Sequence, residues 1–365
     1  MTGWENTTLG CVCRSVSETY HGQDSNVVLV NTSDVFEGEI LAHEYVPNVK
    51  LRGQFKKTFQ KDDILFSEIR PANKRYAYVT LDDTRAYIAS TKLMVLRANR
   101  EKIIPRYLYS FLKSEQILAE LQHLAETRSG TFPQITFDAE LAPLKIILPA
   151  YDTQKKIVDI ISVFDDKIAL NRKINKNLEK QAQAIYRNIF IENYEKSWIE
   201  GSLSELVSIK YGRDHKKLNN GIYPVYGSGG IMRYVDRALY DKESVLIPRK
   251  GSLNNILYVN EPFWSVDTMF YTEMKRNNIA KFIFHFMKGL DLTLLNAGSA
   301  VPSMTTEILN SIPVHLPDTE NLQRFENLVS PLYILMQDHI LESKRLSSLR
   351  DTLLLRLMSG ELDVS

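Results

Sequence analysis

The passages SGTFPQITFDAELAPLKIILP, residues 129–149, and GSAVPSMTTEILNSIPVHLP, residues 298–317, share one design. Each contains a turn of small residues, a proline, a threonine three residues later, and a short apolar run that ends in Leu-Pro. The two Leu-Pro pairs, at Leu148 and Leu316, lie 168 residues apart. A passage repeated at this distance predicts two similar domains within one chain.

The sequence around each passage supports this duplication. Each copy begins near a tryptophan, Trp4 or Trp198, and continues through strand-like stretches and one short helical stretch. Strands mixed with short helices predict a compact α/β domain of the α+β kind in each half. A length of 365 residues suits two such domains, and 44% apolar and 24% charged residues are typical of a globular chain.

Composition excludes several classes of protein. No apolar run approaches the roughly 18 residues that a membrane span needs, and the N-terminal residues show no secretory signal pattern. The two cysteines, Cys11 and Cys13, are too few for a zinc site or a disulfide framework. We therefore expect two reduced thiols in a cytoplasmic protein that does not bind a membrane.

Beyond Leu148-Pro149 and Leu316-Pro317 the apolar period changes from two residues to three and a half. Alternating spacings of four and three residues are typical of a coiled-coil seam. The seam positions are Ile157, Ile161, Phe164, Ile168, Asn171, Asn175, Leu178, Ala182, Ile185 and Ile189 in the first copy, and Phe325, Val329, Leu332, Met336, His339, Ser343, Leu346, Arg350, Leu353 and Leu357 in the second.

Both seams become polar at the same two steps, Asn171 and Asn175 in the first copy and His339 and Ser343 in the second. A polar seam residue costs stability and fixes register. The matched steps therefore predict that these four residues pair the two long helices in one alignment, most simply antiparallel within the chain. The architecture expected is two globules separated by a two-helix spacer with an internal pseudo-twofold repeat. Arg350 interrupts the seam, and Pro331 predicts a kink or a restart of the second helix.

The net charge of +1 hides a segregation of charges along the chain. Residues 1–49 carry one basic residue and seven acids, whereas residues 50–106 carry fourteen basic residues and six acids. A second basic block, residues 210–250, carries nine basic residues and four acids. One basic block per domain suits duplex DNA, whose half-sites about 34 Å apart present the same groove face.

The candidate DNA-binding residues lie in these two basic blocks or directly after the second one. Arginine can bind guanine with two hydrogen bonds and asparagine can bind adenine, while lysine mostly contacts phosphate. The candidates are Lys56, Lys57, Arg70, Lys74 and Arg75 in the first half, and Arg213, His215, Lys216, Lys217, Arg249, Lys250 and Asn254 in the second.

Signatures of an enzyme are weak in this sequence. The stretch YGSGG at Tyr226–Gly230 lacks the remainder of a phosphate-binding loop and predicts a tight turn. Asp267, Glu273 and Lys275 resemble the two acids and one lysine of a metal-dependent nuclease, but their spacing is cramped. No histidine pair has the spacing of a metal site. We therefore expect no catalytic residue and no metal in this chain.

SGTFPQITFDAELAPLKIILP, the stretch TQKKIVDIISVFDDKIALNRKINKNLEKQAQAIYRNIF at residues 153–190, and the ending LRDTLLLRLMSGELDV at residues 349–364 are together similar to one family. YPVYGSGGI at residues 223–231 and GSAVPSMTTEIL at residues 298–309 resemble motifs of the same family. The chain resembles the specificity subunit of type I restriction-modification systems along nearly its whole length.

The resemblance implies a division into domains and a function. It implies a first target-recognition domain at 1–150, a central spacer helix at 151–193, a second target-recognition domain at 194–317 and a C-terminal spacer helix at 318–365. Each recognition domain would bind one half of a split double-stranded DNA target, and the helices would set the gap. Since Trp4–Pro133 and Trp198–Pro302 differ in length, we expect two unlike half-sites.

The resemblance also implies partners. Two modification subunits would dock on this chain and methylate adenine with S-adenosylmethionine, and restriction subunits would add an ATP- and Mg-dependent endonuclease. This subunit itself would hold no cofactor. Three alternatives stay open at this point: a regulator that binds split DNA sites without enzymatic partners, the nuclease named above, and a structural coiled-coil adaptor.

Overall fold

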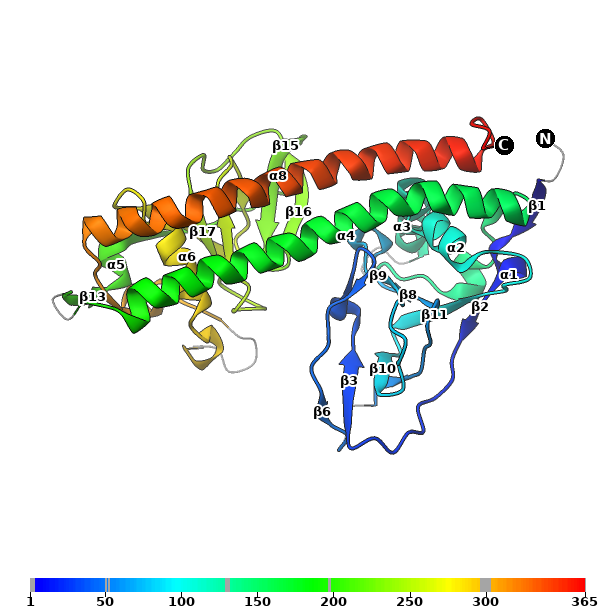
Figure 1. The fold of residues 1–365 in the computed structure, drawn as a ribbon, viewed down its shortest axis with the longest axis horizontal. Helices are drawn as coiled ribbons and strands as arrows, with labels where there is room; N and C mark the ends of the chain where they lie inside the picture. Colours follow the sequence, from blue (N-terminus) through cyan, green and yellow to red (C-terminus); the bar gives the residue numbers. More distant parts are fainter. Residues whose placement is uncertain are drawn as a thin grey trace. The chain divides into compact units, whose positions relative to one another are not determined.

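The computed structural model describes residues 4–49, 51, 53–128, 132–195, 198–295 and 303–364. The chain divides into two compact units, Met1–Asn171 with Leu341–Ser365, and Arg172–Ile340. Two long helices, α4 (Tyr151–Arg187) and α8 (Thr319–Met358), each contribute to both units (Figure 1).

The first unit combines short strands with short helices. Its strands are β1 (Glu5–Thr8), β2 (Cys13–Val16), β3 (Asn26–Val30), β4 (Val35–Phe36), β5 (Glu39–Ile40), β6 (Val46–Pro47), β7 (Phe55–Lys57), β8 (Ile64–Ser67), β9 (Tyr76–Tyr78), β10 (Tyr87–Ser90), β11 (Leu93–Ala98) and β12 (Lys145–Leu148). Its helices and helical turns are α1 (Leu9–Val12), η1 (Thr32–Asp34), η2 (Pro71–Asn73), α2 (Pro105–Leu112), α3 (Glu115–Arg128) and η3 (Phe137–Leu141).

The second unit is built from the same kinds of element. Its strands are β13 (Glu200–Ser202), β14 (Val207–Tyr211), β15 (Asn220–Gly227), β16 (Gly230–Val235), β17 (Ser244–Pro248), β18 (Leu257–Val259), β19 (Trp264–Ser265), β20 (Met269–Met274) and β21 (Pro313–His315). Its helices and helical turns are η4 (Asn188–Glu192), α5 (Leu203–Leu206), α6 (Ala280–Lys288), η5 (Leu292–Leu295) and α7 (Thr306–Asn310).

Strand order confirms the predicted repeat. An antiparallel pair, β1-β12 in the first unit and β13-β21 in the second, brings the two ends of each copy together. An antiparallel four-stranded sheet follows in each unit, with order β2-β11-β8-β9 or β14-β20-β17-β18. A third sheet, β6-β3-β10-β7 or β16-β15-β19, contains one parallel pair in each unit, β3 with β10 and β15 with β19. The fold class is therefore the predicted α+β duplication.

Both units use the long helices to close their cores. In the first unit Ile157 of α4 and Leu357 of α8 lie in one buried cluster with Tyr107 of α2. In the second unit Tyr186 of α4 and Phe325 of α8 lie in one buried cluster with residues of α6. Every predicted seam position is buried or half-buried, so the heptad pattern is confirmed.

The four polar seam residues contact one another across the helix pair. In the first unit Asn171, which is 1% exposed, donates from Nδ2 to Ser343 Oγ at 3.2 Å. In the second unit His339 Nδ1 donates to Asn175 Oδ1 at 2.8 Å. In each unit the partner numbers on α8 fall as those on α4 rise, from Asp165–Arg350 to Asn171–Ser343 in the first and from Asn175–His339 to Tyr186–Phe325 in the second. The helices therefore run antiparallel within each unit, as predicted.

Arg350 occupies its seam position because acidic partners surround it. Its Nη1 donates to Asp165 Oδ1 at 2.8 Å, and its Nη2 pairs with Asp351 Oδ1 at 2.7 Å. Lys113, only 4% exposed, donates to the other oxygen of Asp165. Burial lowers the pKa of Lys113 to about 8, although Asp165 opposes that shift. This charged cluster ties α4 and α8 to the end of α2.

The predicted restart of the second helix at Pro331 is wrong, because α8 continues through this residue. Proline removes one backbone donor and frees the carbonyl of the residue four positions earlier. Pro331 and Asn327 are both exposed, so water can satisfy that carbonyl. The buried Phe325 and Val329 hold the turns of α8 that precede Pro331 against the core.

Replacing Asp165 by Asn should destabilise the chain strongly. The substitution keeps the shape of the side chain but leaves the buried Lys113 without an acidic partner and weakens the pairing of Arg350. Loss of one partner from a buried ion pair costs about 3–5 kcal/mol. Urea unfolding followed by circular dichroism measures the change. Asp82→Asn is the matched control, since Asp82 pairs with Lys61 while its side chain is 86% exposed. Similar small losses in both variants would contradict the expectation.

Candidate nucleic-acid interface

The repeated passage supports one exposed loop in each unit. Loop L1, residues 68–75, follows β8, and loop L2, residues 249–256, follows β17. Ile135 N–H donates to Glu68 O at 2.9 Å in the first unit, and Met304 N–H donates to Arg249 O at 2.9 Å in the second. Ser129–Thr131 and Gly298–Pro302 of the repeated passage lie outside the described residues.

One isolated bridge accompanies these bonds in each unit. Ile69 pairs with Gln134, and Lys250 pairs with Ser303, both in antiparallel orientation. The repeated threonine then caps the helical turn that follows. Thr136 Oγ1 accepts from Ala139 N–H at 3.4 Å, and Thr305 Oγ1 accepts from Ile308 N–H at 3.3 Å. The duplicated passage therefore acts as a brace for L1 and L2.

Three of the predicted basic residues of the first unit lie in exposed or half-exposed positions. Arg70 is exposed and begins the turn η2, with a left-handed backbone at φ 45°. Lys74 ends that turn at φ 54° and lies 3.8 Å from Glu37. Lys56 is exposed on β7. The left-handed conformation costs a residue other than glycine about 1–2 kcal/mol.

Two other predicted residues of the first unit are held inside the protein. Lys57 Nζ donates to Thr91 O at 3.0 Å and to Leu93 O at 2.9 Å, and burial lowers the pKa of Lys57. Arg75 Nη1 donates to Ser33 O at 3.0 Å, and its guanidinium lies over the Phe36 ring. Both side chains stabilise neighbouring strands and loops.

The basic residues of the second unit lie in two segments, one after β14 and the other in L2. Arg213, Lys216 and Lys217 are exposed and His215 is half-buried in the segment that follows β14. Trp264 Nε1 donates to Arg213 O at 2.9 Å and so fixes the start of that segment.

L2 carries the remaining candidates. Lys250 is exposed, and the half-buried Arg249 places its guanidinium 5.8 Å from the centre of the Tyr211 ring. Asn254 is engaged within the protein, because its Nδ2 donates to Asp291 Oδ1 at 2.9 Å and its Oδ1 accepts from Leu292 N–H at 2.8 Å.

The glycine-rich stretch YGSGG forms the predicted tight turn. Gly227 pairs with Gly230 across the β15–β16 hairpin, which leaves Ser228 and Gly229 at the tip. Asn255 of L2 donates from Nδ2 to Ser228 O at 2.7 Å. This bond joins L2 to the hairpin tip, so the two segments form one surface of the second unit.

The nuclease arrangement of Asp267, Glu273 and Lys275 fails. Asp267 precedes β20 while Glu273 lies near its end, a separation of roughly 15–20 Å along an extended strand. Glu273 pairs with Lys210 at 3.5 Å, and Lys275 donates to Ser204 O at 2.6 Å. Among the described residues, no group of three His, Cys, Asp or Glu side chains is placed to hold a metal ion. No described helix combines the length and apolar character of a membrane span.

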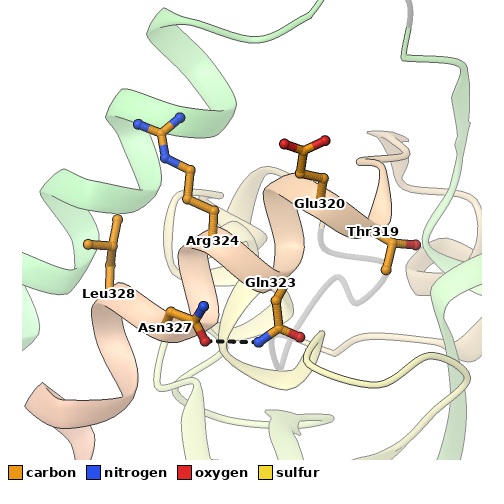
Figure 2. A pocket seen from close by; sticks show the side chains of 6 residues that line it. All are labelled: Thr319, Glu320, Gln323, Arg324, Asn327 and Leu328. Atoms are coloured by element: carbon orange, nitrogen blue, oxygen red, sulfur yellow. Dashed lines mark hydrogen bonds between the residues drawn. The ribbon is translucent and has the colours of Figure 1, made fainter.

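An open hollow of about 790 Å³ lies on the outer face of α8 in the second unit (Figure 2). Its lining residues are Thr319, Glu320, Gln323, Arg324, Asn327 and Leu328. Leu328 is 47% exposed there, and Ile160 is 39% exposed at the equivalent position, 168 residues earlier, on α4. The sequence analysis named neither residue. The repeat distance of 168 residues relates Ile160 to Leu328, so a comparison of the outer faces of the two long helices would have found them.

Comparison with known proteins shows the family of this chain. The family model for the type I restriction modification DNA specificity domain matches residues 1–180 and 195–342. The chain belongs to the type I restriction-modification DNA specificity family. It is thus a specificity subunit with DNA-recognition domains, as the sequence resemblance predicted.

Individual relatives match this chain to different extents. It is 43% identical over 194 residues to the type I restriction enzyme HindI specificity subunit of Haemophilus influenzae, a match that covers 53% of this chain and 42% of that relative. The match therefore spans less than half of the relative's own length. The MjaIX specificity subunit of Methanocaldococcus jannaschii is 22% identical over 308 residues, which cover 73% of this chain and 71% of that relative. The crystal structure of the HsdS subunit from Thermoanaerobacter tengcongensis is 20% identical, with a TM-score of 0.45 and coverage of 99% and 98%.

Substitution of the neighbours Lys56 and Lys57 should change different properties, DNA affinity for Lys56 and stability for Lys57. Lys56→Gln removes an exposed charge, so we expect weaker binding to every duplex and a salt dependence reduced by about one unit in the log–log slope. Lys57→Gln removes two internal hydrogen bonds, so we expect lower stability but unchanged affinity of the folded protein. Fluorescence anisotropy across a salt series, together with thermal melting, separates the two effects. Equal loss of affinity in both variants would contradict this division.

Proposed function

We propose that this chain selects the DNA target of a type I restriction-modification complex by binding a bipartite duplex, one half-site in each unit. The observation that carries this proposal is the duplicated brace. In both units the same passage fixes one exposed loop that carries a cation, Arg70 in L1 and Lys250 in L2. Loops fixed by a rigid scaffold are the usual place for recognition residues.

The long helices supply the second element of the proposal. Polar contacts at Asn171–Ser343 and at Asn175–His339 favour one register over its neighbours. A pair of helices locked in one register suits a spacer, so we propose that it sets the number of unspecified base pairs between the half-sites.

DNA contact in this proposal falls mainly on the exposed cations. The exposed Lys56 and Arg70 and the half-buried Lys74 in the first unit are available to a phosphate backbone or a base edge. Arg213, Lys216, Lys217 and Lys250 are their counterparts in the second. Lys57, Arg75 and Asn254 contribute by holding the strands and loops in place. Arg249 and His215 are half-buried and support the same surface.

The chemistry of the complex is assigned to partner subunits. We propose that two modification subunits dock on this chain and supply adenine methylation with S-adenosylmethionine, and that restriction subunits supply ATP- and Mg-dependent cleavage. The matched exposed side chains Ile160 and Leu328 suit two copies of one partner, because an equivalent apolar position is offered on each helix. A cytoplasmic location follows from this assignment.

The methylated sequence tests the recognition part of the proposal. Single-molecule sequencing of DNA from a host that carries this chain and its partners should reveal methylated adenines in a split motif with two unlike halves and a fixed gap. A palindromic or continuous motif would contradict the proposal. Co-purification with a methyltransferase would exclude the stand-alone regulator, and salt-independent association with DNA would favour the structural adaptor instead.

The stoichiometry of docking tests the partner assignment. We expect Ile160→Asp and Leu328→Asp each to release one of two modification subunits, since each substitution places a charge within one apolar contact. Asn327→Asp is the matched control, because it adds the same charge on the same face of α8 without removing an apolar side chain. Native mass spectrometry counts the subunits. Retention of two copies in both apolar variants would refute docking at these positions.

A further inference from the structure

Arg70 combines an unfavourable backbone with an exposed charged side chain. Five residues other than glycine have positive φ among the described residues, and Arg70 and Lys74 are the two that bracket the turn η2. Positive φ is uncommon for residues that carry a Cβ atom. Within the described part of the chain, the Arg70 guanidinium makes no hydrogen bond or ion pair. No hydrogen bond or ion pair of its side chain within the protein therefore offsets the free-energy cost of the positive φ.

The second unit supplies an internal comparison. The bridge Ile69–Gln134 in L1 is equivalent to the bridge Lys250–Ser303 in L2. The next residue is Arg70 in L1 and Gly251 in L2, and both have positive φ, 45° and 86°. Glycine adopts this conformation without steric cost, and the second unit uses it. The fold thus requires a left-handed residue at this place but does not require an arginine.

L1 is also rigid around Arg70. The Arg70 N–H donates to Pro133 O at 3.1 Å, and the Arg70 carbonyl accepts from Asn73 N–H at 2.8 Å. Lys74 N–H donates to Pro71 O at 3.0 Å, and Pro71 is buried. A side chain on a loop held in this way loses little further backbone freedom on binding, which suits a specific contact.

We propose that Arg70 is a specificity-determining residue that binds one guanine in the half-site of the first unit. This inference rests on the proposed function above. The planar guanidinium donates two parallel hydrogen bonds to O6 and N7 of guanine in the major groove, a pair of acceptors that the other three bases do not offer. Gly251 has no side chain at the equivalent place, so the second unit selects its half-site through other residues. The two half-sites therefore differ in this requirement for guanine.

Arg70→Gly is the informative substitution, because it copies the residue of the second unit and relieves the backbone. We expect a melting temperature at or above that of the wild type. We also expect the methylated motif to become degenerate at one guanine in one half-site, while the other half-site and the gap stay unchanged. A good bidentate contact discriminates between bases by roughly 5- to 150-fold, so the wild type should bind duplexes substituted at that guanine more weakly by this factor. Arg70→Gly should bind the substituted and the original duplexes equally.

Arg70→Lys and Lys56→Gln provide the matched controls. Lysine keeps the charge but lacks the planar fork, so discrimination should fall while salt-dependent affinity remains. Lys56→Gln should weaken binding to all duplexes and leave the motif unchanged.

The outcomes separate this inference from the function on which it rests. An unchanged motif in Arg70→Gly refutes the role of Arg70 and leaves bipartite recognition intact. A wild-type motif without two halves refutes the proposed function itself. If methylation disappears in Arg70→Gly, the binding of the assembled complex to DNA decides between the two possibilities. For each guanine of the motif, four duplexes are compared that carry one of the four bases at that position. A retained preference for guanine overturns the inference, and loss of that preference at one position supports it.

Discussion

The fold depends on the return of the C-terminal helix along the central one. Each unit takes one half of α4 and one half of α8, so neither core is complete until both helices are present. Apolar seam residues supply most of the stabilisation, because burial of apolar surface is the dominant favourable term in folding. The polar contacts of Asn171 and Asn175 fix the register of the helix pair, since a shift by one heptad would place Asn175 opposite Leu332 or Leu346. Buried charge has the same effect near α2, where Asp165 serves both Lys113 and Arg350.

Comparison of the two units separates the structural elements that both contain from those that differ. The antiparallel pair β1-β12 or β13-β21, the four-stranded sheet and the braced loop recur in both units. Among the described residues, the hairpin β4-β5 occurs in the first unit alone, and the third sheet has four strands there but three in the second. The buried clusters around the third sheets contain no described residue of α4 or α8, so the sequence there can change without loss of the helix pairing. Such an arrangement suits the proposed function, in which the partner subunits stay the same while the DNA target changes.

Much of this architecture was predictable because period and repeat are properties of the sequence itself. The heptad pattern placed every seam residue correctly, and the matched polar steps gave the antiparallel pairing. The restart at Pro331 was predicted wrongly, since the cost of a helical proline depends on whether the freed carbonyl faces water. The DNA-binding residues could be named only as clusters. Nothing in the order of residues distinguishes Lys56 from Lys57, because the alternation of faces along β7 and the carbonyls of Thr91 and Leu93 become known only in the folded chain.

Arg70 illustrates how stability and specificity diverge within one loop. Natural proteins retain a strained residue where its side chain does something that an unstrained residue cannot do. Gly251 shows that the same backbone is available without strain, so the brace alone does not explain an arginine in L1. The brace does explain why such a residue can persist, because hydrogen bonds from Arg70 N–H to Pro133 and from Asn73 N–H to Arg70 O hold the loop whatever side chain it carries. A loop fixed by its backbone leaves its side chains free to change with the DNA target, and the repeated passage provides that fixation in each unit.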